Sequence, residues 1–71
     1  MKLITLTQRD YLSDGTYTLR VLYVNIDDIS YFYENSVRSG TIVVLRRGEM
    51  LEVLEDIKDV EAKVRNNNGC N

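Results

Sequence analysis

Residues 42–45 (Ile-Val-Val-Leu) form an unbroken run of branched apolar side chains, and this run constrains the fold more than any other stretch. β-branched residues favour strands, and side chains alternate between the two faces of a strand. The run therefore predicts a strand over residues 41–47 that is apolar on both faces. A chain of 71 residues has few other residues that could cover both faces of this strand. We expect one face to be closed by curling of the sheet or, preferably, by a second copy of the chain.

Other stretches alternate apolar and polar residues with a period of two, which is typical of strands. Asp14-Gly15 and Gly48 supply turn residues between them, and the chain has no proline. The expected strands are residues 2–8, 16–25, 29–34, 41–47 and 50–54. The sequence therefore predicts a mainly β fold of the α+β class: a five-stranded antiparallel meander or small curled barrel with one short C-terminal helix.

The period changes after residue 55, where Ile57, Val60 and Val64 fall on one side of a helix. Asp56 is placed to cap the N-terminus of this helix. Acidic residues near its start and basic residues near its end suit the helix dipole. Residues 1–65 form a single domain in this interpretation, and residues 66–71 are expected to be a disordered polar tail.

The composition argues against several classes of function. There is no histidine, and Cys70 is the single cysteine, which excludes an intrachain disulfide and a cysteine-based zinc site. The net charge of −2 gives little drive for binding nucleic acid. No apolar stretch approaches the ~18 residues of a membrane span. We expect a cytoplasmic, non-enzymatic protein without cofactor or metal, away from membranes, and nucleic acid is a poor candidate partner.

The arginines are the first group that could bind a ligand. Arg46 and Arg47, with Arg38 and Arg20 as further members, could form an anion site, because guanidinium groups pair well with phosphate and carboxylate. The alternative is that charges at strand ends prevent sheets from associating edge to edge.

The aromatic residues of the strand 29–34 are the second group. Alternation places Ile29, Tyr31 and Tyr33 on one face and Phe32 on the other. Tyrosine is enriched at protein interfaces and can also stack on a base. The predicted oligomer interface consists of Ile42, Val44, Tyr31 and Tyr33. The candidate contacts for an anionic nucleotide are Arg38, Arg46, Arg47, Tyr31 and Tyr33.

Between Val24 and Val64 lie Asn25, the pair Asp28-Ile29, the run 41–45 leading to Gly48, Leu51-Glu52-Val53 and the capped segment 56–61. This order resembles the FlbD-like family of small flagellar and swarming-motility proteins, many of which are encoded in phages and mobile elements. The resemblance implies no catalytic residues. A second similarity, through residues 24–33, 41–53 and the helix that follows, is to LytTR-type DNA-binding domains.

Three functions stay open from the sequence. The first is a non-enzymatic, self-associating accessory protein of bacterial or phage origin that binds a protein partner. The second is a phage-encoded antagonist of host defence, which sequesters a signalling nucleotide or blocks an immune effector. The third is a nucleic-acid binder.

Overall fold

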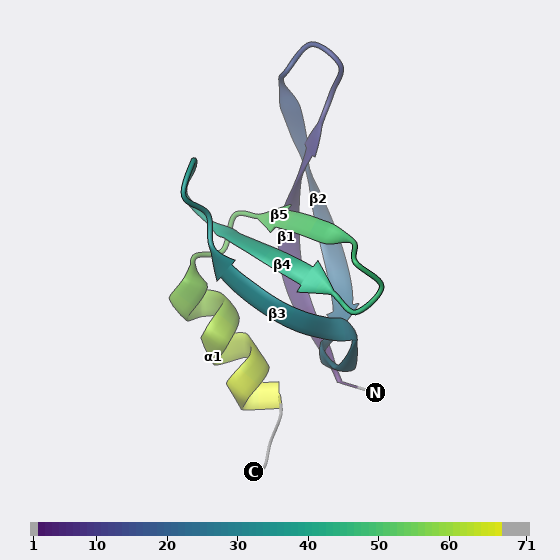
Figure 1. Cartoon of the computed structure of the whole chain (residues 1–71), viewed down its shortest axis with the longest axis vertical. Coiled ribbons are helices and arrows are strands. Elements are labelled where there is room, and N and C mark those ends of the chain that lie inside the picture. Colours follow the sequence, from purple (N-terminus) through teal and green to yellow (C-terminus); the bar gives the residue numbers. More distant parts are fainter. Residues whose placement is uncertain (1, 68–71) are drawn as a thin grey trace.

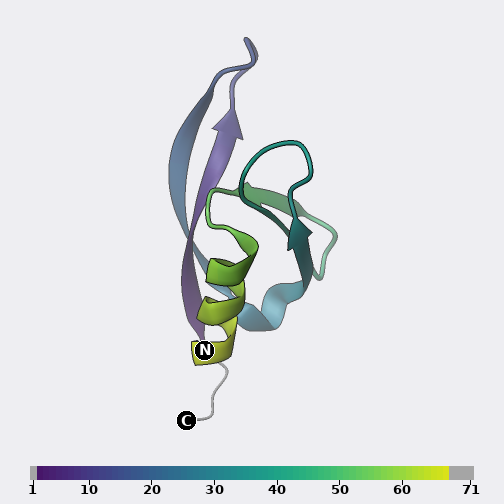
Figure 2. The same ribbon diagram turned by 90° about the vertical axis from the view of Figure 1, so that its left-hand side faces the viewer.

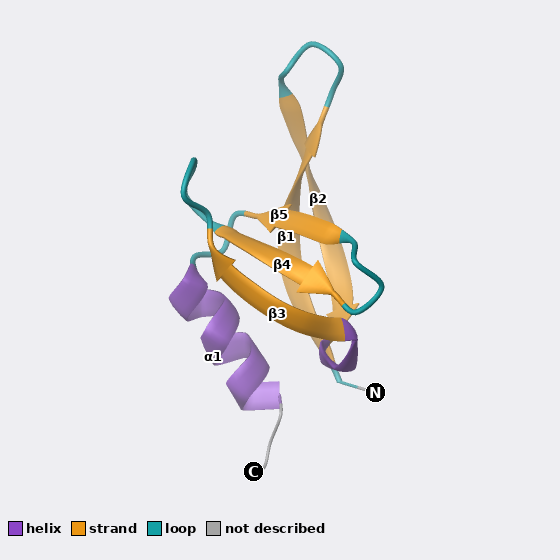
Figure 3. Ribbon diagram, in the orientation of Figure 1, coloured by secondary structure: helices purple, strands orange, loops and turns teal. Residues whose placement is uncertain are grey.

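The computed structural model describes residues 2–67 as one β-sheet with a C-terminal helix (Figures 1 and 3). The elements in chain order are β1 (Leu3–Tyr11), β2 (Tyr17–Asn25), the short 3-10 helix η1 (Ile26–Asp28), β3 (Ile29–Glu34), β4 (Thr41–Leu45), β5 (Met50–Val53) and α1 (Ile57–Asn67). The predicted mainly β fold with one C-terminal helix is therefore confirmed. β1 extends beyond its expected end at residue 8, whereas β4 ends at Leu45, before the two arginines.

All neighbouring strands are antiparallel, and their order across the sheet is β2-β1-β5-β4-β3. Consecutive strands lie side by side, as in a meander, except that β1 pairs with β5 while β2 and β3 do not pair. The strand order is therefore that of a closed five-stranded meander in which the pairing between β2 and β3 is missing. η1 connects these two strands along the chain. The sheet is curled but not closed, and β2 and β3 are its two edges.

The core lies between the β1–β2 hairpin and the β3–β4–β5 part of the sheet, with α1 along one open side (Figures 1 and 2). α1 packs against β1 and β3, and Val60 is its fully buried residue. The buried cluster consists of Ile4, Leu6, Val24, Ile26, Val43, Leu45, Leu51, Val53 and Val60. Because α1 packs against β1 and β3 and buries Val60, it covers part of the inner face of the sheet.

A bulge in β3 changes which residues face the core. Ile29 pairs with Leu45 but Tyr31 pairs with Val44, so Ser30 is an extra residue in β3. Ile29 therefore packs against the core, on the opposite side from Tyr31. The expectation that Ile29 shares a face with the two tyrosines is wrong, because alternation holds only while no residue is inserted.

Asp56 caps α1, since its carboxylate accepts a hydrogen bond of 2.9 Å from the amide of Asp59. The helix continues through Asn67, so Asn66 and Asn67 belong to it and not to a disordered tail. Cys70 and the rest of the expected tail lie outside the described residues. Within residues 2–67, no helix is long and apolar enough to cross a membrane.

Candidate functional site

The predicted interface on β4 is already largely covered by the chain itself. Val43 is fully buried in the core, and Val44, on the opposite face, is only 7% exposed. The expectation that a single chain cannot cover both faces of this strand is therefore wrong. β4 has a neighbour on each side, and the residues directly opposite Val44 are Tyr31 on β3 and Met50 on β5.

The structure does bring the four predicted interface residues together on the outer face of β3 and β4. Tyr31 lies opposite Val44, and Tyr33 lies opposite Ile42. The two tyrosine rings stack with their centroids 6.1 Å apart, and both remain exposed. Val44 adds little exposed area to this surface, because it is only 7% exposed. A role for these residues in an interface stays a prediction.

The predicted arginine site is divided between the two ends of β4. Arg46 and Arg47 follow the strand, whereas Arg38 precedes it in the β3–β4 loop. A five-residue strand is about 16 Å long, so one small anion cannot contact both groups. Arg47 is paired with Glu49 at 2.9 Å, and Arg46 donates to the main-chain carbonyl of Asp27.

Arg20, the fourth arginine considered, is likewise paired, in its case with Asp10 across the β1–β2 hairpin. The structure thus distributes these four arginines over three places, and Arg20, Arg46 and Arg47 each make a local polar contact there. Arg38 belongs to a different group of residues.

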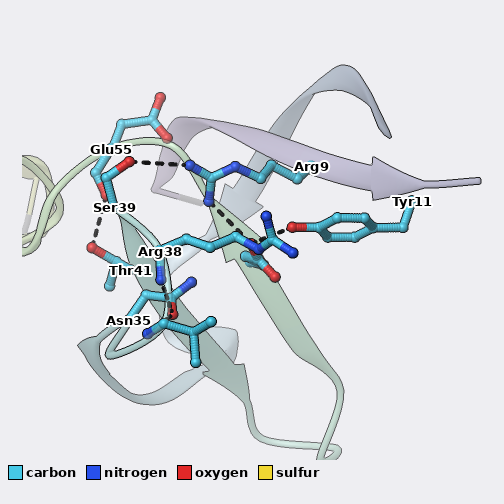
Figure 4. Close-up of polar contacts among 9 residues, drawn as sticks. Arg9, Tyr11, Asn35, Arg38, Ser39, Thr41 and Glu55 are labelled. Atoms are coloured by element: carbon cyan, nitrogen blue, oxygen red, sulfur yellow. Dashed lines mark hydrogen bonds and ion pairs between the residues drawn. The ribbon is translucent and has the colours of Figure 1, made fainter. Parts of the chain in front are cut away.

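That group surrounds Arg9, which sequence analysis did not single out (Figure 4). The Arg9 side chain is only 5% exposed; it donates to the Glu52 carboxylate at 3.1 Å and to the Ser39 hydroxyl at 3.3 Å. The Tyr11 hydroxyl donates to the same Glu52 oxygen at 2.7 Å, and the Arg38 guanidinium lies over the Tyr11 ring. Partial desolvation and the Glu52 carboxylate raise the pKa of Tyr11 above its usual value.

The Arg9 cluster links β1, β5 and the β3–β4 loop, and therefore joins the two parts of the sheet. Its two cations share one carboxylate, and Arg9 is too deeply buried to meet a ligand. Sequence alternation gives no signal for it, because a charged residue in a strand normally faces solvent. We interpret the cluster as structural.

A small cleft opens where β2 faces the β4–β5 turn. Its volume is about 190 Å³, below the ~300–1,000 Å³ of typical small-molecule sites. The lining residues are Leu22, Tyr23, Val24, Asn25, Asp28, Leu45, Arg47, Glu49 and Leu51. Acidic groups accompany its single arginine, which disfavours an anionic ligand. Across residues 2–67, no group of three or more carboxylate, cysteine or histidine side chains could hold a metal ion.

Exposed apolar side chains form a row on the outer face of β2. We call it the outer stripe; it consists of Tyr17, Leu19, Val21 and Tyr23, all exposed, with Val21 at 58% and Tyr23 at 72%. Thr5 and Thr7 lie opposite Tyr23 and Val21 on β1 and are too small to cover them. The end of the hairpin extends beyond the rest of the molecule (Figure 1).

The sequence predicts a strand over residues 16–25 but does not place its apolar residues in an interface. A free edge strand is the feature that the sequence does not reveal, because the position of a strand in the sheet depends on tertiary pairing. The candidate surfaces are therefore the Arg9 cluster, the small cleft and the outer stripe, of which Tyr17 contacts Tyr11 and Arg9. No known family, curated protein or solved structure matches this chain.

Proposed function

We propose that this chain is a cytoplasmic, non-enzymatic protein that associates with itself and acts by binding a protein partner. The observation that carries the proposal is the outer stripe. Apolar side chains exposed in a continuous row are characteristic of protein–protein contact surfaces, and tyrosine is enriched there. In this proposal the chain is an accessory protein of bacterial or phage origin, as the resemblance to the FlbD-like family implies.

The charge distribution favours a protein over an anionic ligand as the partner. Arg20 and Arg47 pair with acidic side chains, and Arg38 shares Glu52 with Arg9. The net charge is −2, which gives little electrostatic attraction to nucleic acid. A protein surface, by contrast, can cover the outer stripe without needing free cations.

Sedimentation velocity over a concentration series tests self-association. We expect the wild-type chain to exceed monomer mass at tens of micromolar. Leu19→Ser combined with Tyr23→Ser should remain monomeric, because both side chains lie on the outer stripe. The matched control is Tyr31→Ser with Tyr33→Ser, which removes two exposed tyrosines from the other outer face and should leave association unchanged.

Two results would count against the proposal. A wild-type chain that stays monomeric at hundreds of micromolar would contradict self-association. A loss of association in the Tyr31/Tyr33 variant alone would transfer the contact to the outer face of β3 and β4, as the sequence predicts.

A further inference from the structure

We infer that the second copy binds by pairing its β2 with the free edge of β2, antiparallel and centred on Val21, so that the two sheets become one. This inference deepens the proposed function and rests on it, since it names how the copies associate. It follows from the hydrogen-bond pattern of the hairpin, from the lack of protection at this edge and from the order of residues along β2.

The hydrogen-bond pattern shows which main-chain groups of β2 are free. Lys2 accepts from the amide of Ile26 at 3.0 Å, and Leu12 donates to the carbonyl of Thr16 at 2.7 Å. Both pairs belong to the register that runs unbroken between β1 and β2. Bonded pairs alternate in an antiparallel ladder, so even-numbered residues of β2 bond to β1. Odd-numbered residues from Tyr17 to Tyr23 direct their N–H and C=O groups towards the open edge, whereas Asn25 is the N-cap of η1.

The outward-directed residues include every member of the outer stripe. A strand added at this edge would therefore gain main-chain hydrogen bonds and lie beside exposed apolar side chains at the same time. Both contributions come from one segment, and the added strand needs no rearrangement of β1. This coincidence favours edge pairing over packing of the outer face alone.

The two edges of the sheet differ in protection. Proteins usually guard an edge strand with a bulge, a proline or a lysine, which prevents association. β3, at one edge, has the bulge at Ser30. β2, at the other edge, has none of the three over residues 17–25. Its single charge, Arg20, is compensated by Asp10 within the same chain.

The order of residues in β2 indicates how the two strands align and which strand is added at the edge. Val21 is the middle residue of the strand, so pairing centred on it uses the full length of both copies. Val21 then lies opposite Val21 of the second copy, and Leu19 opposite Tyr23, which gives apolar cross-strand pairs. Centring on Arg20 would place two guanidinium groups opposite each other. Centring on Leu22 would leave Tyr17 unpaired. A second copy of β2 is therefore a complementary strand for β2.

A nine-residue strand is about 30 Å long, so the interface is small. Small interfaces usually give weak complexes, and we expect a dimer that dissociates in the micromolar range. The test has to be made above and below this range.

Charge exchange at the centre of the register is the first experiment. Val21→Lys and Val21→Glu should each be monomeric, because like charges would meet at the two-fold axis. An equimolar mixture should form a dimer of one copy of each. The same pair of substitutions at Val37, which is 84% exposed in the β3–β4 loop, is the matched control and should leave association unchanged. A mixture that remains monomeric would overturn the Val21-centred register.

Amide hydrogen exchange of the wild-type chain is the second experiment and needs no variant. In the dimer, the amides of Leu19, Val21 and Tyr23 should exchange at least about tenfold more slowly than in the dilute monomer. The amides of Arg20 and Leu22 should be protected in both, because they bond to β1. A dimer with unprotected odd-numbered amides would overturn edge pairing and leave self-association standing. A chain that never dimerises would overturn both.

Discussion

The outer faces of β2 and β4 carry the same kind of residue and have opposite exposure. Val21 on β2 is 58% exposed, whereas Val44 on β4 is 7% exposed, although both valines point away from the core. β4 lies between β3 and β5, so Val44 has a large side chain opposite it on each side, Tyr31 and Met50. β2 is an edge strand, and Val21 has only Thr7 opposite it.

This difference shows that the number and size of neighbouring strand residues decide whether an apolar outer face is covered. Hydrophobicity along the strand does not decide it. The sequence predicts that residues 42–45 need a partner to cover them. In the structure, neighbouring strands of the same sheet cover most of their surface. The unsatisfied surface lies at the edge, on the β1–β2 hairpin, and this part of the molecule should respond differently to substitution from the β3–β4–β5 part.

Two glycines with positive φ give the largest expected contrast. Gly40 precedes β4 with φ +110°, and a Cβ there would lie far closer than 3.0 Å to the carbonyl oxygen of Val53. Gly40→Ala therefore combines backbone strain with a main-chain clash. We expect it to lower the free energy of unfolding by about 4 kcal/mol or more. Urea denaturation followed by circular dichroism measures this.

The control for Gly40→Ala is Gly15→Ala in the hairpin turn. Gly15 also has positive φ, +91°, but nothing lies within 4 Å of the position of a Cβ. Only the conformational strain remains, about 1 kcal/mol. Equal losses in the two variants would contradict the close packing inferred for the β3–β4 loop.

Arg9→Met tests the cluster that joins the two parts of the sheet. The substitution keeps a long apolar side chain but leaves the Glu52 carboxylate without its most buried partner. Part of the loss is offset, because the Arg9 Nε–H has no hydrogen-bond partner among the described residues. We expect a loss of about 2 kcal/mol in the free energy of unfolding.

The matched substitution is Arg20→Met, which removes the cation of the Arg20–Asp10 pair on the hairpin. Both partners of that pair are exposed, and exposed pairs contribute about 0.5 kcal/mol or less. If the two variants lose the same stability in urea, Arg9 does not hold the two parts together.

Val44→Ala and Val21→Ala compare the two outer faces directly, with the same atoms removed from each. Val44→Ala should cost about 1–2 kcal/mol, because it leaves a gap between Tyr31 and Met50. Val21→Ala should cost about 0.5 kcal/mol or less in a monomeric sample, since the side chain is exposed. Thermal unfolding at low concentration measures both, and a larger loss for Val21→Ala would reverse the comparison.

The fold could be predicted because its local signals agree. Alternation located the strands, Asp14-Gly15 and Gly48 marked turns, and Asp56 caps α1 as expected. The buried faces of β1 and β5 also follow from alternation, with Ile4 and Leu6 on one strand and Leu51 and Val53 on the other. These features depend on residues close to one another in the chain.

The candidate site could not be predicted to the same extent, because it depends on pairing between distant segments. The β1–β5 contact makes β2 an edge strand, and this contact joins Gln8 to Val53. The same contact lets Arg9 reach Glu52, so a charged residue is buried where alternation predicts exposure. The bulge at Ser30 likewise becomes visible only in the register between β3 and β4.

The smallest expected effect concerns the turn of the hairpin, at Asp14. Thr16 donates to the Asp14 carboxylate from its hydroxyl at 2.6 Å and from its amide at 3.0 Å, and these bonds lower the pKa of Asp14 below its ordinary 3.8. A carboxyl whose pKa is lowered by folding stabilises the folded state above its unfolded pKa, and this contribution disappears as the pH falls through the folded pKa. The turn should therefore loosen only in acid, below the ordinary pKa.

Thr16→Val keeps the amide donor and removes the hydroxyl, so the pKa of Asp14 should rise towards 3.8 in an NMR titration of its carboxyl carbon. If the hairpin end is independent of the core, the amide shifts of residues 12–16 should follow this titration in the wild-type chain. Those of β4 should not follow it, since β4 lies in the other part of the sheet. The comparison with Asp14→Asn identifies the shifts that belong to Asp14 and not to other carboxyl groups. Shifts in β4 that titrate with Asp14 would show that the hairpin end and the core respond as one unit.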